Sequence, residues 1–369
     1  MEFDFFMPVK TVSGPDSVIK NSALLKEYGK RCMLVTGGLS ARMSGALDDV
    51  QAALQKEGIV FDRFDGIGPN PLISACHAAG MRAREFGADF IIGIGGGSPL
   101  DAAKAAAIYA SNAELQPMDI YKRIYDNSPL PLVLIGTTAG TGSEVTSVSV
   151  LTIDETGRKR SISGPDCYAK LAYADPKYTH SVPYDITIST ALDAFSHGVE
   201  AWFTPKCDGI SKCFAQKGLT MLWAALKVLN KTGELPSKSL RAELYYGSLY
   251  TGLAINTCGT AYPHPLGYIL TENYGVPHGK ACAVFMPSFL ERAHKYEPNK
   301  LTELLVWLGT DLAALSKIIT ELTGLPRLHI TKDQAARYAE RWFAEAPKNF
   351  ASSPGGLTVK DAEEFLAKL

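Results

Sequence analysis

The chain has 369 residues, of which 46% are hydrophobic and 20% charged, and this length exceeds what one hydrophobic core usually organises, so two domains are expected. A formal net charge of −1 provides no long-range attraction for nucleic acid or anionic lipid, and neither is expected as a partner. The apolar stretches are far shorter than the roughly 20 residues that span a bilayer, so no membrane span is expected.

The first residues alternate along the chain in a pattern typical of a strand. The alternation places Phe3, Phe5 and Met7 on one side and Glu2, Asp4 and Phe6 on the other. Such a pattern predicts an edge strand, whose unpaired backbone groups favour a partner. We therefore expect a homodimer with these strands near the interface; the alternative is that they pair within the chain.

Seven cysteines are distributed without a Cys-x-x-Cys pair or a regular spacing. Free cysteine packs as a small apolar side chain, so these are expected to be reduced and mostly buried thiols. Because such thiols persist in reducing compartments, and because the first residues lack the pattern of a secretory signal, the sequence predicts a cytoplasmic protein.

Short apolar runs alternate with helical patterns in the first half of the chain. Buried strands are predicted at residues 31–36, 90–94 and 132–135, and helices at residues 46–57 and 74–86. Strands that alternate with helices predict a mostly parallel, doubly wound α/β sheet of the Rossmann-like class.

Helical periodicity dominates the second half of the chain. Long helical patterns cover residues 211–229, 239–255 and 299–322, and no β-type run interrupts them. The sequence therefore predicts an α/β domain over residues 1–180 and an all-α domain over residues 181–369.

A glycine-rich turn follows the second predicted strand. Gly95, Gly96, Gly97 and Ser98 lead into an alanine-rich helical stretch that includes Lys104. Glycines let backbone N–H groups approach a pyrophosphate, the helix N-terminus adds its positive dipole end, and the serine adds a hydroxyl donor. The spacing differs from the G-x-G-x-x-G fingerprint, so a turn needed only for strand-to-helix geometry stays open as an alternative.

A second glycine-bearing loop, residues 137–146, follows the third predicted strand directly and is rich in threonine. Ligands of open α/β sheets bind beyond the carboxyl ends of the strands, where both loops are expected to converge. The two loops together therefore indicate a dinucleotide cofactor site in the α/β domain, against the alternative of hydroxyl-rich helix caps and turns.

Four possible metal ligands lie in the predicted helical domain. Asp193 and His197 are four residues apart in a predicted helical segment, so both side chains project from one face. His264 and His278 lie beside Pro and Gly residues that restrict the backbone. One oxygen and three nitrogens suit Fe(II) or Zn(II) rather than calcium or magnesium. Taken singly, each histidine is more often a structural residue than a ligand, and this alternative stays open.

Six motifs resemble, in order and close to the expected spacing, those of the iron-containing alcohol dehydrogenases, particularly members of the 1,3-propanediol and butanol dehydrogenase type. The motifs are Asn70-Pro71, Gly95 to Lys104, Thr137 to Thr146, Asp175-Pro176, Asp193 to Glu200 and Pro277-His278-Gly279. The family shares its fold with glycerol dehydrogenase and dehydroquinate synthase. The resemblance spans nearly the whole chain and implies that same fold here.

The resemblance also implies roles for individual residues. It implies that the helical domain is catalytic and that Asp193, His197, His264 and His278 bind its metal. For the cofactor, the resemblance implies that the pyrophosphate binds at Gly95, Gly96, Gly97 and Ser98. It implies that the adenine and ribose lie against Thr137, Thr138, Thr141 and Thr146, with a further ribose contact at Lys159. The nicotinamide end would then lie near Asp101.

The sequence departs from the family pattern at two positions. Tyr268 stands where many members carry a second histidine, four residues after the third ligand, so a proton-relay role there falls to a side chain with a reference pKa of about 10. Gly37 stands where NAD-preferring members place an aspartate against the ribose 2′-hydroxyl. Ser40 and Arg42 could donate hydrogen bonds to a 2′-phosphate, so together with Gly37 they predict a preference for NADP(H) over NAD(H). The alternative is that Gly37 serves only the turn.

These features together predict metal-dependent hydride transfer between a small alcohol or aldehyde and NAD(P). One alternative is a glycerol dehydrogenase-like enzyme or a dehydroquinate synthase-like lyase on the same fold. The lyase needs basic residues for a phosphorylated substrate, whereas the ligands have apolar and aromatic neighbours in the sequence. Another alternative, a cofactor-binding protein without catalysis, would be expected to lack a ligand, and all four are present.

Overall fold

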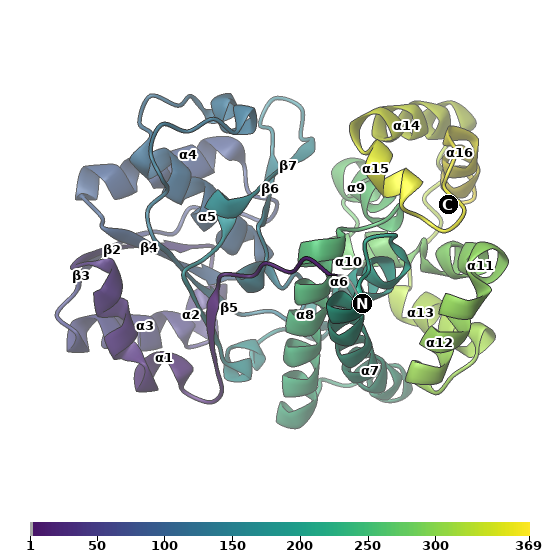
Figure 1. Cartoon of the computed structure of the whole chain (residues 1–369), viewed down its shortest axis with the longest axis horizontal. Helices are drawn as coiled ribbons and strands as arrows, with labels where there is room; N and C mark the ends of the chain where they lie inside the picture. The colour runs from purple at the N-terminus through teal and green to yellow at the C-terminus, as the bar shows by residue number, and fades with distance from the viewer. Residues whose placement is uncertain (1–2) are drawn as a thin grey trace. The chain divides into compact units, whose positions relative to one another are not determined.

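The computed structural model describes residues 3–369, which divide into two compact units (Figure 1). The first, here called the sheet unit, comprises Met7–Thr138 and Gly142–Val182. The second, here called the helical unit, comprises residues 3–6, the short segment Ala139–Thr141 and Pro183–Leu369. The chain therefore enters the helical unit briefly within the second of the two predicted cofactor loops.

A six-stranded parallel sheet forms the centre of the sheet unit, with the strand order β1-β8-β5-β4-β2-β3. Its strands are β1 (Lys10–Ser13), β2 (Arg31–Thr36), β3 (Val60–Phe64), β4 (Phe90–Gly95), β5 (Leu132–Gly136) and β8 (Leu171–Ala174). A separate antiparallel pair consists of β6 (Val148–Thr152) and β7 (Lys159–Ser163). The three predicted strands are β2, β4 and β5, which lie at the buried centre of the sheet.

Helices cover both faces of this sheet. They are α1 (Ser17–Lys20), α2 (Ser40–Met43), α3 (Ala46–Lys56), α4 (Ile73–Phe86) and α5 (Gly97–Ser111). Successive residues of a strand point to opposite faces, so Phe90, Ile92 and Ile94 of β4 join a core with α1 and α3, whereas Ile91 joins a core with α4 and α5. Full burial of one such side chain contributes roughly 1.5–3 kcal/mol. The predicted doubly wound sheet is confirmed.

Two glycines let α5 pack closely in this unit. A Cβ atom on Gly93 of β4 would lie 2.7 Å from Cβ of Ala103, and one on Gly80 of α4 would lie 2.5 Å from Cβ of Tyr109. Real Cβ atoms do not approach other atoms so closely, so both positions require glycine. The result is that α5 begins directly after β4, with its N-terminus at the carboxyl edge of the sheet.

All regular secondary structure described in the helical unit is α-helical, as predicted. Its helices are α6 (Tyr184–Phe203), α7 (Gly209–Thr232), α8 (Lys238–Cys258), α9 (Pro263–Tyr274), α10 (His278–Ala283), α11 (Met286–Tyr296), α12 (Pro298–Leu308), α13 (Leu312–Thr323), α14 (Lys332–Glu345), α15 (Pro347–Ala351) and α16 (Val359–Ala367). The helices predicted over residues 211–229 and 239–255 are α7 and α8.

The helical pattern over residues 299–322 corresponds to two helices in the structure, α12 and α13, with a break that was not predicted. Gly309 has a φ of 59°, in the left-handed region, and ends α12. Asp311 then accepts a hydrogen bond from the backbone N–H of Ala314 at 2.8 Å and caps α13. The apolar period continues across the break, so periodicity alone does not detect it.

The edge strand predicted at the amino terminus is wrong within the described residues. Residues 3–9 belong to no strand, and β1 begins only at Lys10, where it pairs with β8. The Phe5 ring instead packs against Phe214 of α7 with centroids 5.5 Å apart, and the Asn256 side chain of α8 donates a hydrogen bond to the Phe6 carbonyl at 3.1 Å. Glu2 lies outside the described residues, and the homodimer stays a prediction.

Two expectations from composition can be compared with the structure. Between residues 3 and 369, no helix has both the length and the apolar character needed to cross a bilayer. All seven cysteines are free; five are buried, Cys207 is half-buried and Cys213 is exposed. The expectation of mostly buried thiols is confirmed.

Candidate metal centre

Helix α6 carries three functional side chains on one face. Asp193, His197 and Glu200 follow one another at intervals of four and three residues, which places them one above the other along a helix. All three side chains are buried. Burial of two carboxylates and an imidazole in an otherwise apolar helix requires strong compensating partners.

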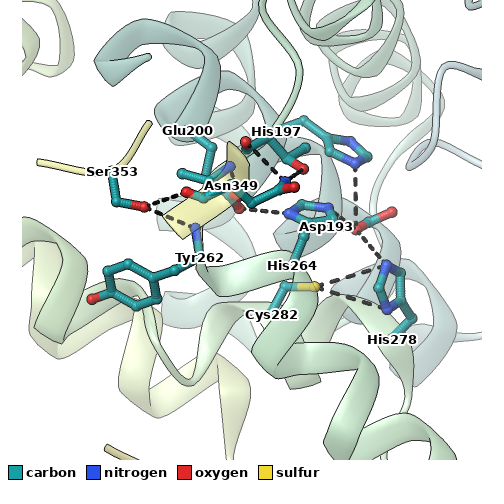
Figure 2. Close-up of polar contacts among 11 residues, drawn as sticks. Asp193, His197, Glu200, Tyr262, His264, His278, Cys282, Asn349 and Ser353 are labelled. Atoms are coloured by element: carbon teal, nitrogen blue, oxygen red, sulfur yellow. Dashed lines mark hydrogen bonds and ion pairs between the residues drawn. The ribbon is translucent and has the colours of Figure 1, made fainter. Parts of the chain in front are cut away.

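Two further helices bring histidines to this face (Figure 2). His264 lies in the first turn of α9, where Pro263 suits the start of a helix, and His278 is the first residue of α10. Gly279 allows α10 to approach α6: an added Cβ would lie 1.7 Å from the Ser189 carbonyl oxygen and 2.9 Å from Cβ of Asp193. Glycine at this position therefore places His278 against the face of α6 that carries Asp193.

The four side chains converge on one point. Oδ1 of Asp193 lies 3.8 Å from Nε2 of His197, 3.6 Å from Nε2 of His264 and 3.7 Å from Nε2 of His278. Four atoms bound about 2.0–2.3 Å from one ion at tetrahedral angles lie roughly 3.3–3.8 Å apart. The structure thus brings the four predicted ligands together at separations that fit a first-row divalent metal.

Two of these atoms also lack partners among the described residues. Oδ1 of Asp193 and Nε2 of His264 are buried and form no hydrogen bond there. A buried polar atom without a partner costs roughly 1–3 kcal/mol, so two that point at the same space need an explanation. A metal ion bound between them satisfies both.

The protonation states agree with a cation site. Burial raises the pKa of Asp193, but His197 and the other imidazoles outweigh this effect and keep its pKa well below the ordinary value. Burial lowers the pKa of His197 to about 4, so this ring is neutral at neutral pH. Burial also lowers the pKa of His264, but the carboxylates of Glu200 and Asp193 reverse this and raise it to about 10. Without metal, a proton on His264 supplies positive charge that a divalent ion would replace.

Glu200 orients the His264 ring through a contact with Nδ1, the ring nitrogen that faces away from Asp193. One carboxylate oxygen lies 2.6 Å from Nδ1 of His264, and the other accepts a hydrogen bond from the Ala261 backbone N–H at 2.7 Å. A carboxylate bound to the far nitrogen of a ligand histidine fixes its tautomer and directs Nε2 at the metal. Glu200 ends the motif that begins at Asp193, but no role for it was predicted; its helical spacing from Asp193 is the signal in the sequence that could have indicated one.

The backbone before His264 is anchored by α15 and the turn that follows it. Ser353 accepts a hydrogen bond from the backbone N–H of Tyr262 at 3.0 Å and donates one to the Asn349 carbonyl at 2.8 Å. The Asn349 amide in turn donates to the Thr260 carbonyl at 3.0 Å. Asn349 and Ser353 therefore hold the segment that leads to His264 (Figure 2).

The predicted relay residue Tyr268 lies next to the fourth ligand. Its ring stacks on His278 with centroids 5.1 Å apart and planes 10° apart, and it also contacts Trp342 at 5.3 Å. This contact fixes the orientation of the His278 ring. A proton-transfer role for Tyr268 stays a prediction.

The first predicted cofactor loop lies at the start of α5. Gly95 ends β4 with a φ of 153°, and a Cβ there would lie 2.6 Å from Pro99. Gly96 is the N-cap residue and Gly97 the first helical residue, so backbone N–H groups are presented at the helix N-terminus. Ser98 accepts a hydrogen bond from the Asn70 backbone N–H at 3.1 Å, which brings a third quoted motif to this turn.

The second predicted loop meets the first. A Cβ on Gly96 would lie 3.2 Å from the Thr138 side chain, and the Thr137 N–H donates a hydrogen bond to the Gly95 carbonyl at 2.8 Å. Thr146 is buried in the sheet unit, Thr141 belongs to the helical unit and Lys159 begins β7. The structure therefore places Thr137 and Thr138 directly beside the glycine turn.

Asp101 and Lys104 of α5 form hydrogen bonds with the second loop and with the strand that follows it. Asp101 accepts hydrogen bonds from the Ser143 hydroxyl at 2.7 Å and from the Val150 N–H at 2.8 Å. The fully buried Lys104 donates to the Ser143 hydroxyl at 2.8 Å and to the Val148 carbonyl at 2.6 Å. These contacts fix the second loop on α5. Contact between Asp101 and the nicotinamide stays a prediction.

The structure corrects the interpretation of Gly37. The space beside it is filled: an added Cβ would lie 2.4 Å from the Ile67 carbonyl oxygen, and Gly37 forms a bridge with Gly66. The backbone therefore requires glycine whatever the cofactor, so the turn alone accounts for the absence of an aspartate at residue 37. Ser40 donates a hydrogen bond to the Gly37 carbonyl at 3.3 Å and stabilises the turn.

A pocket beyond the carboxyl end of β2 joins the predicted Arg42 to two charged residues that were not predicted, Arg63 and Asp65. Gly38, Arg42, Arg63 and Asp65 are among its lining residues, and Nη2 of Arg63 lies 3.1 Å from Oδ2 of Asp65. Gly38 has a φ of 47° and open space where a Cβ would be. The strand that carries Arg63 was itself not predicted, because β3 is only half-buried and mixes polar with apolar residues.

Two family models of known proteins match this chain, one over most of the sheet unit and one within the helical unit. The family model described as iron-containing alcohol dehydrogenase matches residues 8–176, and the C-terminal model of the Fe-containing alcohol dehydrogenase family matches residues 187–341. The 1,3-propanediol dehydrogenase of Klebsiella pneumoniae is 30% identical over 86% of this chain and 82% of its own length.

Two solved structures share the whole fold. An iron-containing alcohol dehydrogenase from Thermotoga maritima is 30% identical, with a TM-score of 0.91 over 100% of this chain and 99% of its own. A sulfoacetaldehyde reductase from Bifidobacterium kashiwanohense, in complex with NAD⁺, is 26% identical, with a TM-score of 0.87 over 100% of this chain and 99% of its own. The chain therefore belongs to the iron-containing alcohol dehydrogenase family.

Proposed function

We propose that this chain transfers a hydride between a small alcohol or aldehyde and a nicotinamide cofactor with the help of a metal bound by Asp193, His197, His264 and His278. The convergence of these four side chains carries the proposal, because two of their ligand atoms are buried without partners among the described residues. The family assignment points to Fe(II), and the ligand set also suits Zn(II). The bound ion supplies Lewis-acid polarisation of the substrate oxygen.

The protein's own residues hold and orient this site. Glu200 fixes the tautomer of His264, and Tyr268 fixes the plane of the His278 ring. Aromatic side chains such as Phe195 and Tyr262 are buried near the ligands in sequence, which favours a small uncharged substrate over the phosphorylated substrate of a lyase. The four intact ligands likewise favour an enzyme over a protein that only binds a cofactor.

The direct test is oxidation of NADH and NADPH in the presence of a panel of small aldehydes. Protein loaded with Fe(II), and separately with Zn(II), should consume reduced cofactor and yield the matching alcohol in equal amounts. Dehydroquinate synthase-like chemistry would leave the cofactor concentration unchanged, since that reaction has no net oxidation. Cofactor loss without alcohol formation, or no turnover with any aldehyde, would contradict the proposed function.

For the cofactor, we propose a preference for NADP(H), supported by the side chains beyond β2. Arg42 and Arg63 contribute two positive charges beside a single carboxylate, Asp65, so the pocket favours a 2′-phosphate. The neighbouring structure in complex with NAD⁺ shows that the fold also accepts the cofactor without this phosphate.

Arg42→Ala should lower kcat/KM for NADPH by about 10- to 100-fold, because a hydrogen bond to a charged group contributes roughly 1.5–3 kcal/mol. The value for NADH should stay within about twofold. Gly38→Asp should weaken NADPH in the same way, because open space surrounds this position; its φ of 47° strains a side chain, so thermal unfolding of the variant is measured alongside. Gly37→Asp is a poor test because its Cβ meets the Ile67 carbonyl. Wild-type enzyme that is more efficient with NADH than with NADPH would contradict the preference.

A further inference from the structure

The segment between α8 and α9, residues 260–262, receives two side chains from the C-terminal part of the chain (Figure 2). The Asn349 amide donates hydrogen bonds to the Thr260 carbonyl at 3.0 Å and to the Thr260 hydroxyl at 2.9 Å. The Ser353 hydroxyl accepts a hydrogen bond from the Tyr262 N–H at 3.0 Å. A buried backbone group needs such a partner, and this segment belongs to no helix or strand that could supply one.

Glu200 holds the residue between these two contacts. One oxygen of its carboxylate accepts a hydrogen bond from the Ala261 N–H at 2.7 Å, and the other lies 2.6 Å from Nδ1 of His264. The same carboxylate thus contacts the backbone of the segment and the imidazole three residues later. A shift of the segment therefore displaces Ala261 relative to Glu200, and with it the carboxylate that orients the ligand ring.

Asn349 and Ser353 are themselves fixed in place. The Ser353 hydroxyl donates to the Asn349 carbonyl at 2.8 Å, and the Ser353 carbonyl accepts a hydrogen bond from the Gly356 N–H at 2.8 Å. Arg292 of α11 donates to the Pro354 carbonyl at 3.3 Å. Ser353 is only 4% exposed. These contacts make α15 and the turn after it an ordered support for the segment before α9.

The position of Nε2 of His264 has little tolerance. This atom lies 3.6 Å from Oδ1 of Asp193, and the ligands of a metal site need to be held within about 0.5 Å of their productive positions. Only Pro263 separates Tyr262 from His264 in the sequence. A displacement of the Tyr262 backbone therefore reaches the ligand directly.

We propose that Asn349 and Ser353 are positioning residues of the metal centre, which set the location of the His264 ring against Asp193. The inference rests on the proposed metal-dependent function and gives α15 and the turn after it a part in metal affinity and coordination geometry. Residues that only stabilise the fold would change the midpoint of thermal unfolding without changing either property of the metal site.

Cobalt substitution separates these two roles, because the visible ligand-field bands of Co(II) report its coordination geometry. Ser353→Ala and Asn349→Ala should each weaken Co(II) binding by about tenfold in competition with a chelator, the lower end of the effect of removing a group that supports a ligand. The visible bands of the Co(II) that is still bound should change in position and intensity, because His264 is no longer held in its wild-type orientation.

Thr323→Val is the matched control, since it removes a buried hydroxyl that donates to the Ile319 carbonyl at 2.7 Å within α13. It should lower the midpoint of thermal unfolding and keep the wild-type cobalt spectrum and affinity. A wild-type spectrum and affinity in Ser353→Ala and Asn349→Ala would overturn the positioning roles and leave the four-ligand site intact. Failure of the wild type to bind cobalt at all would overturn the four-ligand site itself, and the positioning roles with it.

Discussion

Glu200→Ala should weaken metal binding by about 10- to 100-fold, the usual effect of removing the residue that orients a ligand histidine. The variant leaves Nδ1 of His264 and the Ala261 N–H without their buried acceptor. Removing one partner of a buried pair typically costs 3–5 kcal/mol, so the midpoint of thermal unfolding should also fall. Loss of Glu200 also removes the carboxylate that raises the pKa of His264 in the metal-free protein.

Competition with a chelator measures the affinity, and thermal unfolding with and without metal measures the stability. Glu200→Gln keeps one acceptor oxygen and should lie between wild type and Glu200→Ala in both. Glu243→Ala removes an equal charge from an exposed position on α8 and should change neither. If Glu200→Ala bound metal as tightly as Glu243→Ala, the contact with His264 would have no part in the metal site.

The part of the fold that could be predicted consists of elements whose pattern is complete within a few residues. The runs 31–36, 90–94 and 132–135 are buried on both faces, so their apolar character alone marks β2, β4 and β5. β3 is half-buried and β8 has only four residues, so neither has a comparable pattern. They become strands because the neighbouring strands pair with them.

In the candidate site, too, features with a local sequence pattern could be predicted and features that depend on distant residues could not. The spacing of Asp193 and His197 is local and marks a shared helical face, whereas the role of Glu200 depends on His264, which lies 64 residues away. The sequence could not decide between a cofactor role and a turn role for Gly37, because the atom that excludes a side chain there belongs to Ile67, which a bridge between Gly37 and Gly66 brings close. The sequence reveals residue types and intervals, but contacts between distant segments require the fold.

Asp193→Asn should remove bound metal and lower kcat/KM for aldehyde reduction by about a thousandfold. Asn has the same shape but no charge, and Asp193 is the common neighbour of all three histidines at 3.6–3.8 Å. Loss of a Lewis acid costs several kcal/mol of transition-state stabilisation, and each 1.4 kcal/mol is about tenfold in rate. The glycine turn and all of the second cofactor loop except Ala139–Thr141 belong to the sheet unit, so NADPH binding should remain within about twofold of wild type.

The decisive measurement is metal content and turnover on the same preparations of wild type, Asp193→Asn, His278→Ala and Asp185→Asn. Asp185 is exposed in the first turn of the same helix, so its variant has the same change in charge at a position away from the ligands. We expect about one equivalent of metal and full activity in wild type and Asp185→Asn, and neither in the two ligand variants. Full metal content with wild-type turnover in Asp193→Asn or His278→Ala would contradict the assignment of these residues as ligands of the catalytic metal.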